Sequence, residues 1–487
     1  MSEATRVAVI GAGISGVVTA GHLLAAGIQV TVFERNNAAG GVWLYDKRTP
    51  IEAQYPSPRP SASQEYVKDE RGENERKILL HAPPGPCYES LTNNVSTPLL
   101  RTTLNAWPEG TGHFVKHHVL KEYIQDTSNK AGVDDITKYG ARVTRVHKDG
   151  PTWTVHWSTL SEGQDPVENE ESATFNSVIV ASGHYHTPLV PNIQGLPEAK
   201  ARWPQRIFHS KSFRSSKEFE GKNVLLLGGG VSSLDIAKEI SETANYVYQS
   251  TRNGAFDLPE TALPKNASRI AEVKAFESST STSSDTEHLP LTVHLKSGEL
   301  LNDIDTIILC TGYQMAVPFL DDYNDYDVSA TEANDRVLVT DGTQVHNLHK
   351  DIFYIPDPTL AFVGIPFYTA TFSLFEFQAI AVAAFLSGVA RLPSTTSLRT
   401  EYESRVTKKG LGRNFHSLKD QEKPYVDELI EWVNTGRVER GLPLLEGHTE
   451  TWIKERAALV ERLKLLLAGQ LTREDALKPP LEVGVAA

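Results

Sequence analysis

The chain opens with a short apolar run, a glycine turn, apolar positions at helical spacing and a second apolar run. The first run covers residues 7–10, the helical pattern covers 14–26 and the second run covers 29–33. Apolar positions three and four apart predict a helix, and short apolar runs bounded by turns predict strands. We therefore expect a βαβ unit at the start of the chain.

The same order returns near the middle of the chain. The segment NVLLLGGGVSSLDIAKEI, which begins at Asn223, predicts a strand, a glycine turn and a helix, and residues 246–249 predict the next strand. The first glycines of the two turns, Gly11 and Gly228, are too far apart for a repeat array. The spacing predicts two separate nucleotide-binding domains.

Other patterns predict elements that surround these two units. Strict alternation of apolar and polar residues in TWTVHW, which ends at Trp157, and in residues 292–298 predicts antiparallel strands. Helical periodicity after Gly388, as in residues 451–468, assigns the C-terminal third to packing. Polar composition predicts solvent loops without chemistry at residues 61–77, 161–172 and 277–287.

Length and charge narrow the class of protein. At about 150 residues per domain, 487 residues predict about three folding units. The 48 Lys and Arg against 61 Asp and Glu give a net charge of −13, which disfavours nucleic acid and anionic lipid as partners. The apolar stretch 372–390 is interrupted by Glu376 and Gln378, so we expect no membrane anchor. Without a signal or transit pattern, we expect a cytoplasmic protein.

The cysteine content excludes several kinds of chemistry. Cys87 and Cys310 are the two cysteines of the chain. Two cysteines far apart exclude a disulfide framework, a four-cysteine zinc site and the paired cysteines of disulfide reductases. We therefore expect a reducing compartment and no metal site.

The first glycine turn has the spacing of a dinucleotide-binding motif. Gly11, Gly13 and Gly16 follow the first strand and open the helix, together with Ile14 and Ser15. Glycine at these places permits a tight turn, close approach of a pyrophosphate and close contact between helix and strand. The helix N-terminus attracts phosphate. A turn that serves packing alone is the alternative.

An acidic residue ends the second strand. Glu34 stands where a carboxylate can accept hydrogen bonds from both ribose hydroxyls, and Arg35 follows it. A carboxylate at this place repels a 2′-phosphate. The first site should therefore hold FAD or NAD.

The second glycine turn carries the opposite ribose preference. Ser233 replaces the third glycine and is still small enough for a close contact between helix and strand. A guanidinium with neighbouring hydroxyls at the end of the next strand suits a 2′-phosphate, although a solvated surface arginine is the alternative. We expect NADPH at this site, and the residues that would hold it are Gly228, Gly230, Val231, Ser232, Ser233, Ser250, Thr251 and Arg252.

Two dinucleotide sites of opposite ribose preference predict hydride transfer from NADPH to a second cofactor, and flavin is the usual acceptor. Because a redox cysteine pair is absent from the sequence, the reduced flavin must pass its electrons to oxygen, to an external acceptor or to an organic substrate. The glycine turns alone leave these three outcomes open.

Six further segments of the chain are informative together. They are GGVW at 40–43, YESLTNN at 88–94, ASGH at 181–184 before Pro188 and Pro191, WPQRIFHSKSF at 203–213, DTIILCTGY at 305–313 before Pro318, and LAFVG at 360–364 before Glu376 and Gln378. With these segments the chain resembles, from Val7 to about Leu386, the class B flavoprotein monooxygenases of the flavin-containing monooxygenase type. The departures from the family pattern are Asn93 for threonine, Trp203 and Gln205 for phenylalanine and glycine, and Cys310 for alanine.

The resemblance implies an α/β protein with two Rossmann-like dinucleotide-binding domains. A discontinuous FAD domain would cover residues 1–184 and 312–487, the latter with the C-terminal helices, and an NADPH domain would be inserted over 185–311. Asn94 would position the substrate or the peroxy group, and His209 would orient the domain junction. The residues implied at FAD are Gly11, Gly13, Ile14, Ser15, Gly16, Glu34, Arg35, Gly41, Val42, Trp43, Asn94, Val143 and Gln378, and those at the junction are Thr311, Gly312 and Tyr313.

The resemblance also implies an activity. NADPH would reduce FAD, oxygen would add at carbon 4a, and the hydroperoxide, shielded by retained NADP, would oxygenate a small substrate. An amine nitrogen or a sulfur is the expected target, as in N,N-dimethylaniline-type monooxygenases, giving N-hydroxylated, N-oxide, nitrone or S-oxide products. Phe213 favours this over Baeyer–Villiger oxidation of a ketone, because Baeyer–Villiger enzymes typically have Trp or Asp there.

Two other classes of function remain as alternatives. One is a flavoprotein that passes NADPH electrons to a partner or quinone without inserting oxygen. The other is a non-catalytic dinucleotide sensor, which would require one broken site. The sequence names neither the substrate nor the oligomeric state, and a homodimer stays open.

Overall fold

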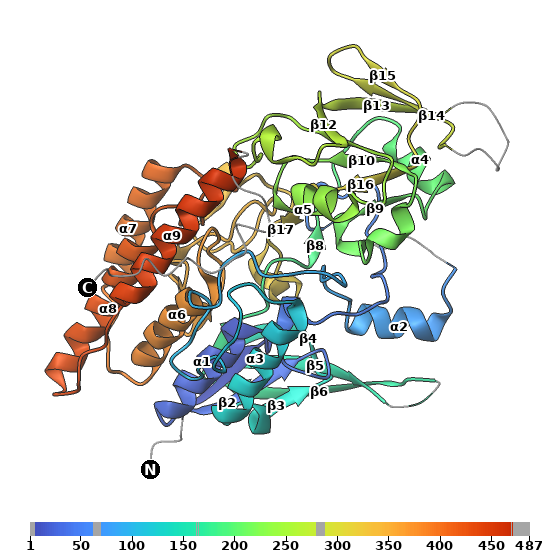
Figure 1. The fold of residues 1–487 in the computed structure, drawn as a ribbon. Helices are drawn as coiled ribbons and strands as arrows, with labels where there is room; N and C mark the ends of the chain where they lie inside the picture. Colours follow the sequence, from blue (N-terminus) through green and yellow to red (C-terminus); the bar gives the residue numbers. More distant parts are fainter. Residues whose placement is uncertain are drawn as a thin grey trace, which may run out of the picture.

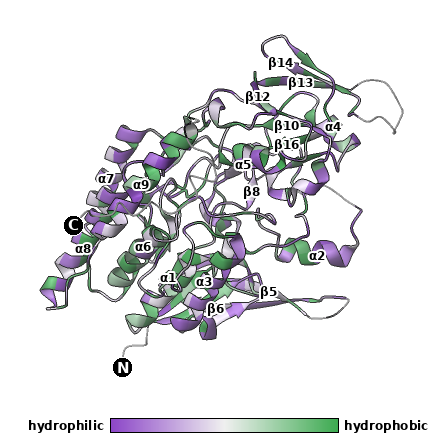
Figure 2. Ribbon diagram, viewed as in Figure 1, coloured by the Kyte–Doolittle hydropathy of each residue, from purple (hydrophilic) through white to green (hydrophobic). Residues whose placement is uncertain are grey.

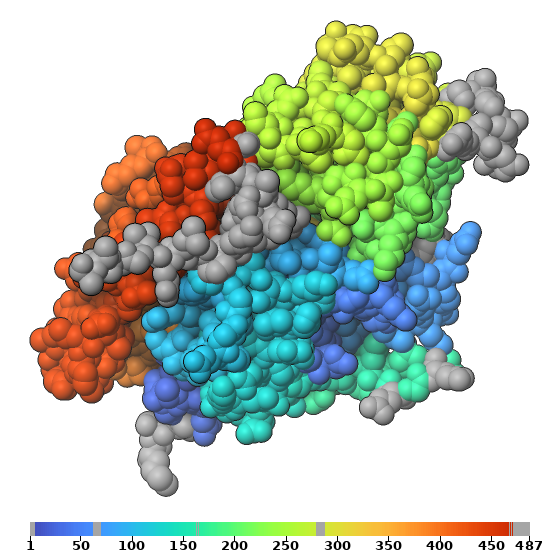
Figure 3. Space-filling view, in the orientation of Figure 1, coloured from blue at the N-terminus to red at the C-terminus, as the bar shows by residue number. Residues whose placement is uncertain are grey.

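Two parallel sheets organise the computed structural model, which describes residues 5–61, 70–161, 163, 165–278, 288–468 and 470. In Figure 1 the first sheet, with the N-terminus, lies in the lower part of the molecule and the second in the upper right. Helices of the C-terminal part lie along the flank of both. The space-filling view in Figure 3 shows the same three regions in blue to cyan, green to yellow and orange to red.

The first sheet is built from both ends of the chain. Parallel pairing joins β1 to β2 and β7, and β7 to β20. The chain therefore leaves this sheet after β7 and returns to it at β18. In sheet order the strands are β18 Leu348–His349, β19 Phe353–Tyr354, β20 Leu360–Phe362, β7 Ser177–Val180, β1 Arg6–Ile10, β2 Gln29–Glu34 and β3 Thr137–Tyr139.

The second sheet is formed entirely by the inserted segment. All of its pairings are parallel. The order is β12 Ala267–Ile270, β11 Tyr246–Ser250, β10 Asn223–Leu227, β16 Thr306–Leu309 and β9 Ile207–His209, with helices α4 Leu196–Arg202 and α5 Val231–Ile240. The predicted βαβ units and the two-domain α/β class are confirmed.

Two linkers join the sheets and pair with each other. The strand β8, Thr187–Pro188, lies antiparallel to β17, Tyr313–Gln314. The predicted domain boundaries at residues 184 and 311 fall just before these strands. The two crossings are thereby held together as one short ladder.

Two small antiparallel sheets flank the parallel ones, as the alternating segments predicted. They contain β4 Arg142–Asp149, β5 Thr152–Leu160 and β6 Glu168–Phe175, and β13 Val273–Ser278, β14 Leu291–Leu295 and β15 Leu300–Leu301.

All three predicted loops overlap regular structure, since β13 ends inside the stretch 277–287, so those predictions were wrong in part. The strand β6 lies inside the stretch 161–172 and continues to Phe175, and helix α2, Glu73–His81, begins inside the stretch 61–77. The strand β6 is largely exposed, and helix α2 is polar and only partly buried, so both look like loops in the sequence. Residues 62–69, 162, 164 and 279–287 of the predicted loops lie outside the described residues.

Helix α6, Thr371–Leu386, packs against α1, Ile14–Ala25, and against α8, Glu422–Glu439. Because α6 is apolar nearly all round, as its colour in Figure 2 shows, it is buried inside the protein. No helix in the described part of the chain is both long and apolar enough to cross a bilayer. The remaining α-helices of the described residues are α3 His117–Lys130, α7 Thr395–Lys409 and α9 Glu450–Leu467.

Candidate functional site

The first glycine turn leaves no space for side chains. Gly11 has a φ of +106°, and a Cβ on Gly16 would lie 1.8 Å from the Gly11 carbonyl oxygen. The first helical hydrogen bond of α1 runs from the Val17 N–H to the Gly13 carbonyl at 3.0 Å. The N–H groups of the residues just before Val17 therefore lie at an open helix end, where an anion binds.

The Gly40–Gly41 pair covers this turn. A Cβ on Gly41 would lie 2.9 Å from the Cα of Gly13, and Gly41 has a φ of +56°. A short 3-10 turn over Gly41–Trp43 follows, with Val42 exposed and Trp43 packed against the core. The two glycine segments form a side-chain-free cradle in which a pyrophosphate can approach the backbone.

Glu34 is held at the end of β2 by its own neighbours. Its Oε2 accepts the Ala12 N–H at 2.7 Å, and its Oε1 accepts the Asn36 N–H and Nδ2 at 2.8 Å each. The carboxylate is buried, so the charge lies fixed at the strand end beside the turn. Arg35 instead contacts the linker, with 2.8 Å between its guanidinium and the His186 Nδ1.

Asn93 and Asn94 have opposite surroundings. Asn93 is buried: its Nδ2 donates to the carbonyls of Val95 and His113 at 2.7 and 2.9 Å, and its Oδ1 accepts the Val115 N–H at 2.6 Å. Asn94 is exposed, and its side chain has no hydrogen bond to any described residue. Asn93 therefore anchors the segment, and Asn94 has its amide available for a ligand.

Val143 and Gln378 lie farther from the turn. Val143 is on β4, opposite Trp157, whose ring lies 4.8 Å from that of Phe33 on β2. Gln378 is fully buried on α6; its Oε1 accepts the Gly364 N–H at 3.0 Å and its Nε2 donates to the Tyr425 hydroxyl at 2.8 Å. Gln378 thus acts on the site through Gly364, whose Cβ position would be 3.2 Å from the Cβ of Ser15.

The second glycine turn repeats the geometry of the first. Gly228 has a φ of +123°, and its Cβ would lie 2.4 Å from the Cys310 carbonyl oxygen. Gly230 precedes the first residue of α5, and Val231 and Ser232 are exposed at that helix end. The Ser233 hydroxyl points inward and accepts the Gln249 Nε2 at 3.0 Å. Serine in place of the third glycine is therefore accommodated by a hydrogen bond.

The three residues at the end of β11 have different surroundings, since two are buried and one is exposed to solvent. The Ser250 hydroxyl is used inside the protein, donating to the Ala271 carbonyl at 2.9 Å and accepting the Val273 N–H at 3.0 Å. Thr251 is buried, with its hydroxyl bonded to Asn253. Arg252 is exposed and has no hydrogen bond or ion pair in the described part of the chain.

A second guanidinium lies near Arg252, and sequence reasoning missed it. The pKa of Arg413 is lowered, first by burial among its neighbours and then by the positive charge of Arg252. An Arg413 nitrogen also lies 3.9 Å from the Cβ position of Gly312 in the linker. No local motif marks Arg413, because it is brought to the junction from the segment after α7.

The His209 ring is held in a single tautomer and bonds to the linker. Its Nδ1 accepts the Lys211 N–H at 3.1 Å, so its Nε2 carries the proton and donates to the Gly312 carbonyl at 3.0 Å. Burial lowers the pKa of His209 to about 4, so the ring is neutral at pH 7. On either side of Gly312, the Thr311 hydroxyl donates to the Leu189 carbonyl and the Tyr313 ring packs edge-on against the His209 ring.

Other polar groups at the junction carry no sequence motif either. The Lys211 Nζ donates to the His186 carbonyl at 2.7 Å, and burial lowers the pKa of Lys211 to about 7. Glu52 accepts hydrogen bonds from Tyr55, Ser212 and the His209 N–H. These groups connect the segment that contains Glu52 and Tyr55, the linker and the end of β9 into one polar network.

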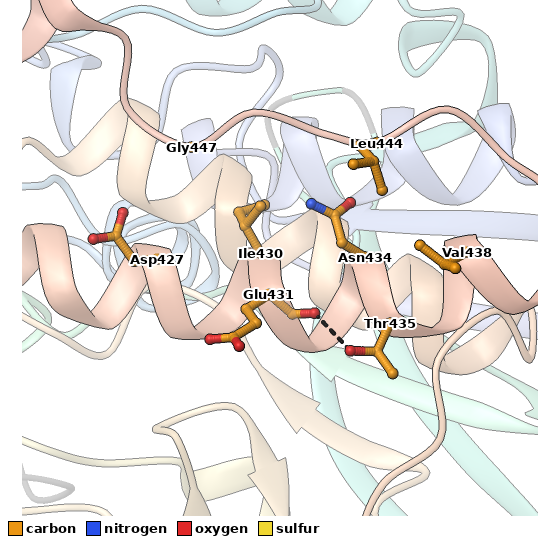
Figure 4. A pocket seen from close by; sticks show the side chains of 8 residues that line it. All are labelled: Asp427, Ile430, Glu431, Asn434, Thr435, Val438, Leu444 and Gly447. Carbon is orange, nitrogen blue, oxygen red and sulfur yellow. Dashed lines mark hydrogen bonds between the residues drawn. The ribbon is translucent and has the colours of Figure 1, made fainter.

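Away from this junction the protein has a shallow groove on α8. It is lined by Ile430, Asn434, Val438 and Leu444 among others, and Figure 4 shows the Thr435 hydroxyl bonded to the Glu431 carbonyl within the helix. The groove contains no side chain from either glycine turn. We therefore assign this groove no role in dinucleotide binding.

The residues present fit FAD and NADPH. Each glycine turn provides an open helix end and a cradle that a Cβ would fill, with an acid at one strand end and a free guanidinium at the other. Within the described residues no group of three His, Cys, Asp or Glu could hold a metal ion. Two dinucleotide turns that meet at one junction define a two-cofactor flavoprotein oxidoreductase.

Comparison with known proteins narrows this class. Residues 84–263 and 283–441 match the flavin-binding monooxygenase-like family, and residues 9–59 match the NAD(P)-binding Rossmann-like domain. The chain belongs to the flavin-binding monooxygenase-like family. It is a flavoprotein monooxygenase with FAD and NADPH as cofactors, and it acts on a small molecule with oxygen.

Similar proteins span nearly the whole chain. The chain is 49% identical to the flavin-containing monooxygenase ustF2 of Aspergillus flavus, covering 95% of this chain and 98% of the relative. It is 30% identical to iboF of Amanita muscaria, covering 90% and 89%. Among solved structures, the S-allyl-L-cysteine S-oxygenase from Allium sativum matches with a TM-score of 0.68, 25% identity and coverage of 97% and 96%.

Proposed function

We propose that the protein oxygenates a nucleophilic nitrogen or sulfur atom of a small organic substrate, using NADPH and molecular oxygen. The observation that carries this proposal is the exposed, unpartnered amide of Asn94 beside the buried anchor Asn93. An oxygenating flavin needs a few positioned hydrogen bonds and the exclusion of water rather than a strong acid or base. The similarity to an S-oxygenase supports sulfur as one target.

In this proposal the first turn, with Gly11, Gly13, Gly16, Gly41 and Glu34, holds FAD. FAD, when bound, supplies the chemistry: reduced by NADPH, it activates dioxygen at carbon 4a. The backbone of the turn binds the pyrophosphate, and the Glu34 carboxylate accepts hydrogen bonds from the ribose.

The second turn and its cations hold NADPH. Arg252 and Arg413 are the residues we assign to the 2′-phosphate, because guanidinium groups form the strongest pairs with phosphate. Ser250 and Thr251 lie buried beside Arg252 at the strand end, and their hydroxyls are used internally.

His209 has a positioning role in this proposal. Its neutral ring donates to the Gly312 carbonyl, and with a pKa of about 4 it supplies no proton at neutral pH. Asn94 is the residue that we assign to orient the substrate, since its amide can both donate and accept a hydrogen bond.

Oxidation with isotopically labelled oxygen tests the proposed function. Purified holoenzyme is incubated with NADPH, ¹⁸O₂ and a panel of amines, thioethers and ketones. One labelled oxygen atom in an N- or S-oxide for each NADPH consumed is the expected result. NADPH oxidation with electrons passed only to dyes or quinones would show a reductase instead.

Baeyer–Villiger oxidation of a ketone is the second candidate. Cyclohexanone monooxygenase shares the fold with a TM-score of 0.53 at 12% identity. The residue used to separate the two reactions, Phe213, is buried and packs against Tyr88 and Phe219. A labelled ester from the ketone arm of the same panel would favour this candidate.

A further inference from the structure

An aromatic pair joins the loops that lie over the two glycine turns. Phe256 follows β11 on the NADPH side, and Tyr368 follows β20 on the FAD side. Their ring centroids lie 6.1 Å apart with an interplanar angle of 15°, an offset stack within the range of favourable aromatic pairs. Phe367 also lies 6.1 Å from Phe256. The contact connects two segments that belong to different sheets.

The loop that contains Phe256 lies directly on the second turn. The Leu258 N–H donates to the Gly229 carbonyl at 2.8 Å, and a Cβ on Gly229 would lie 2.6 Å from the Asp257 carboxyl carbon. The Phe256 carbonyl oxygen lies 3.7 Å from the Cβ position of Gly230. A dinucleotide bound at this helix end is therefore next to the Phe256 loop.

The loop that contains Tyr368 begins at the first turn. Gly364 lies against Ser15, and Phe367 is held on both sides, because its N–H donates to the His416 carbonyl at 3.3 Å and its carbonyl accepts the Leu418 N–H at 3.0 Å. Two residues after Tyr368, the Ala370 N–H donates to the carboxylate of Glu422. The backbone around Tyr368 is thus fixed from outside the loop.

Tyr368 itself is strained and exposed. It has a φ of +61°, in the left-handed region that bulky residues rarely adopt, and 40% of it is accessible to solvent. Such strain persists where the surroundings enforce it, and it is concentrated at ligand-binding sites. No hydrogen bond connects its hydroxyl to the described residues, so the ring face is the part of the side chain that makes the contact.

We propose that Phe256 and Tyr368 form a latch that holds the nicotinamide dinucleotide at the second turn. The pair parts to admit the ligand and closes over it, which slows its release. Both are positioning residues, since their rings part and close over the ligand while the backbone around Tyr368 stays fixed. This inference rests on the proposed assignment of NADPH to the second turn.

The test measures NADP⁺ release from the oxidised holoenzyme, without substrate or turnover. Tyr368→Asn keeps a residue that tolerates a positive φ and removes the ring, and Phe256→Ala removes the other ring. An aromatic pair of ordinary strength predicts that each change speeds NADP⁺ dissociation about 2- to 12-fold. The double variant should release NADP⁺ no faster than the single variants. Tyr368→Phe, which keeps the ring, should release NADP⁺ as slowly as the wild type.

Two controls separate the latch from other causes. FAD content should stay at the wild-type value in every variant, which shows that the fold and the first turn are intact. Tyr246→Ala removes one ring of the Tyr246–Tyr248 pair, at 4.9 Å, on the same sheet away from the latch, and should leave NADP⁺ release unchanged. Hydrogen exchange supplies a second readout: NADP⁺ should protect residues 254–258 and 366–370 in the wild type but not in Phe256→Ala.

Unchanged NADP⁺ dissociation in both single variants, or fully additive effects in the double variant, would overturn the latch. Failure of the wild-type holoenzyme to bind NADP⁺ at all would instead overturn the proposed function. The two failures are therefore distinguishable.

Discussion

The Nε2 atom of His209 lies 3.0 Å from the carbonyl oxygen of Gly312, so the end of β9 in the second sheet holds the linker that returns to the first. Both groups lie at the point where the chain crosses between the dinucleotide sites. The hydrogen bond gives the two sites a fixed relation at this crossing. His209, which belongs to a sequence motif, thus acts here through a hydrogen bond to the backbone.

The neutral state of His209 predicts a pH dependence of stability. Burial lowers its pKa to about 4, whereas a histidine in an unfolded chain titrates near pH ~6.5. Between these values the unfolded chain binds a proton that the native protein does not, so the free energy of unfolding falls as the pH drops through this window. His209→Gln should flatten the fall by at most about 1.4 kcal/mol per pH unit. Urea unfolding across the window checks this, and an unchanged slope would contradict it.

Glu422 predicts the opposite dependence. Burial raises the pKa of this carboxyl to about 7 from 4.5, although it accepts the Ala370 N–H. The native protein therefore keeps a proton that the unfolded chain loses, and the free energy of unfolding falls as the pH rises from 4.5 through 7. Glu422→Gln, which still offers an acceptor, should be more stable than the wild type above pH 7 by up to about 3 kcal/mol. Equal stability of the two proteins at alkaline pH would show that the fold does not raise the pKa of this carboxyl.

Asn93 and Asn94 provide a matched pair of substitutions. Asn93→Ala leaves the partly buried Val115 N–H without its acceptor and should lower the free energy of unfolding by about 1 to 3 kcal/mol. Asn94→Ala should leave the unfolding curve unchanged but lower oxygenated product per NADPH about tenfold, since one orienting hydrogen bond is lost. Product yield and hydrogen peroxide release measure the second effect. If Asn94→Ala gives full product yield, the assignment of Asn94 is wrong.

Gly16 is expected to be indispensable for FAD. A Cβ at this position would lie 1.8 Å from the Gly11 carbonyl, so Gly16→Ala must displace the turn. We expect purified Gly16→Ala to contain little or no FAD by its absorbance. Gly85→Ala is the control, because nothing in the described structure lies within 4 Å of its Cβ position. A fully yellow Gly16→Ala protein would show that FAD does not bind at this turn.

Arg252 and Arg413 should select NADPH over NADH. Loss of a charge-assisted hydrogen bond to the 2′-phosphate predicts that Arg252→Ala raises KM for NADPH about 10- to 100-fold with little change for NADH. Arg413→Ala should have the same selective effect. Arg145→Ala, which removes an exposed guanidinium on β4, is the control. A parallel loss for both nucleotides would mean that these arginines do not contact the 2′-phosphate.

Much of the fold could be predicted because its signals are local. The strands and helices around Gly11 and Gly228 follow from periodicity and glycine spacing over about thirty residues, and Glu34 and Arg252 follow by counting to the next strand end. Strand β6 escaped prediction because it is exposed and polar, and helix α2 because it is polar and buries only Leu79 and His81, so neither carries a clear apolar period.

The sequence by itself determined the two glycine turns and the family to which the chain belongs, because backbone geometry near a phosphate demands glycine at fixed spacing. Only the tertiary structure decided which of two adjacent asparagines is buried, and that the Gln378 amide is used by Gly364 and Tyr425. It alone placed Arg413 near Arg252 and stacked Tyr368 on Phe256. These relations join segments far apart in the chain, and packing between the two sheets creates them.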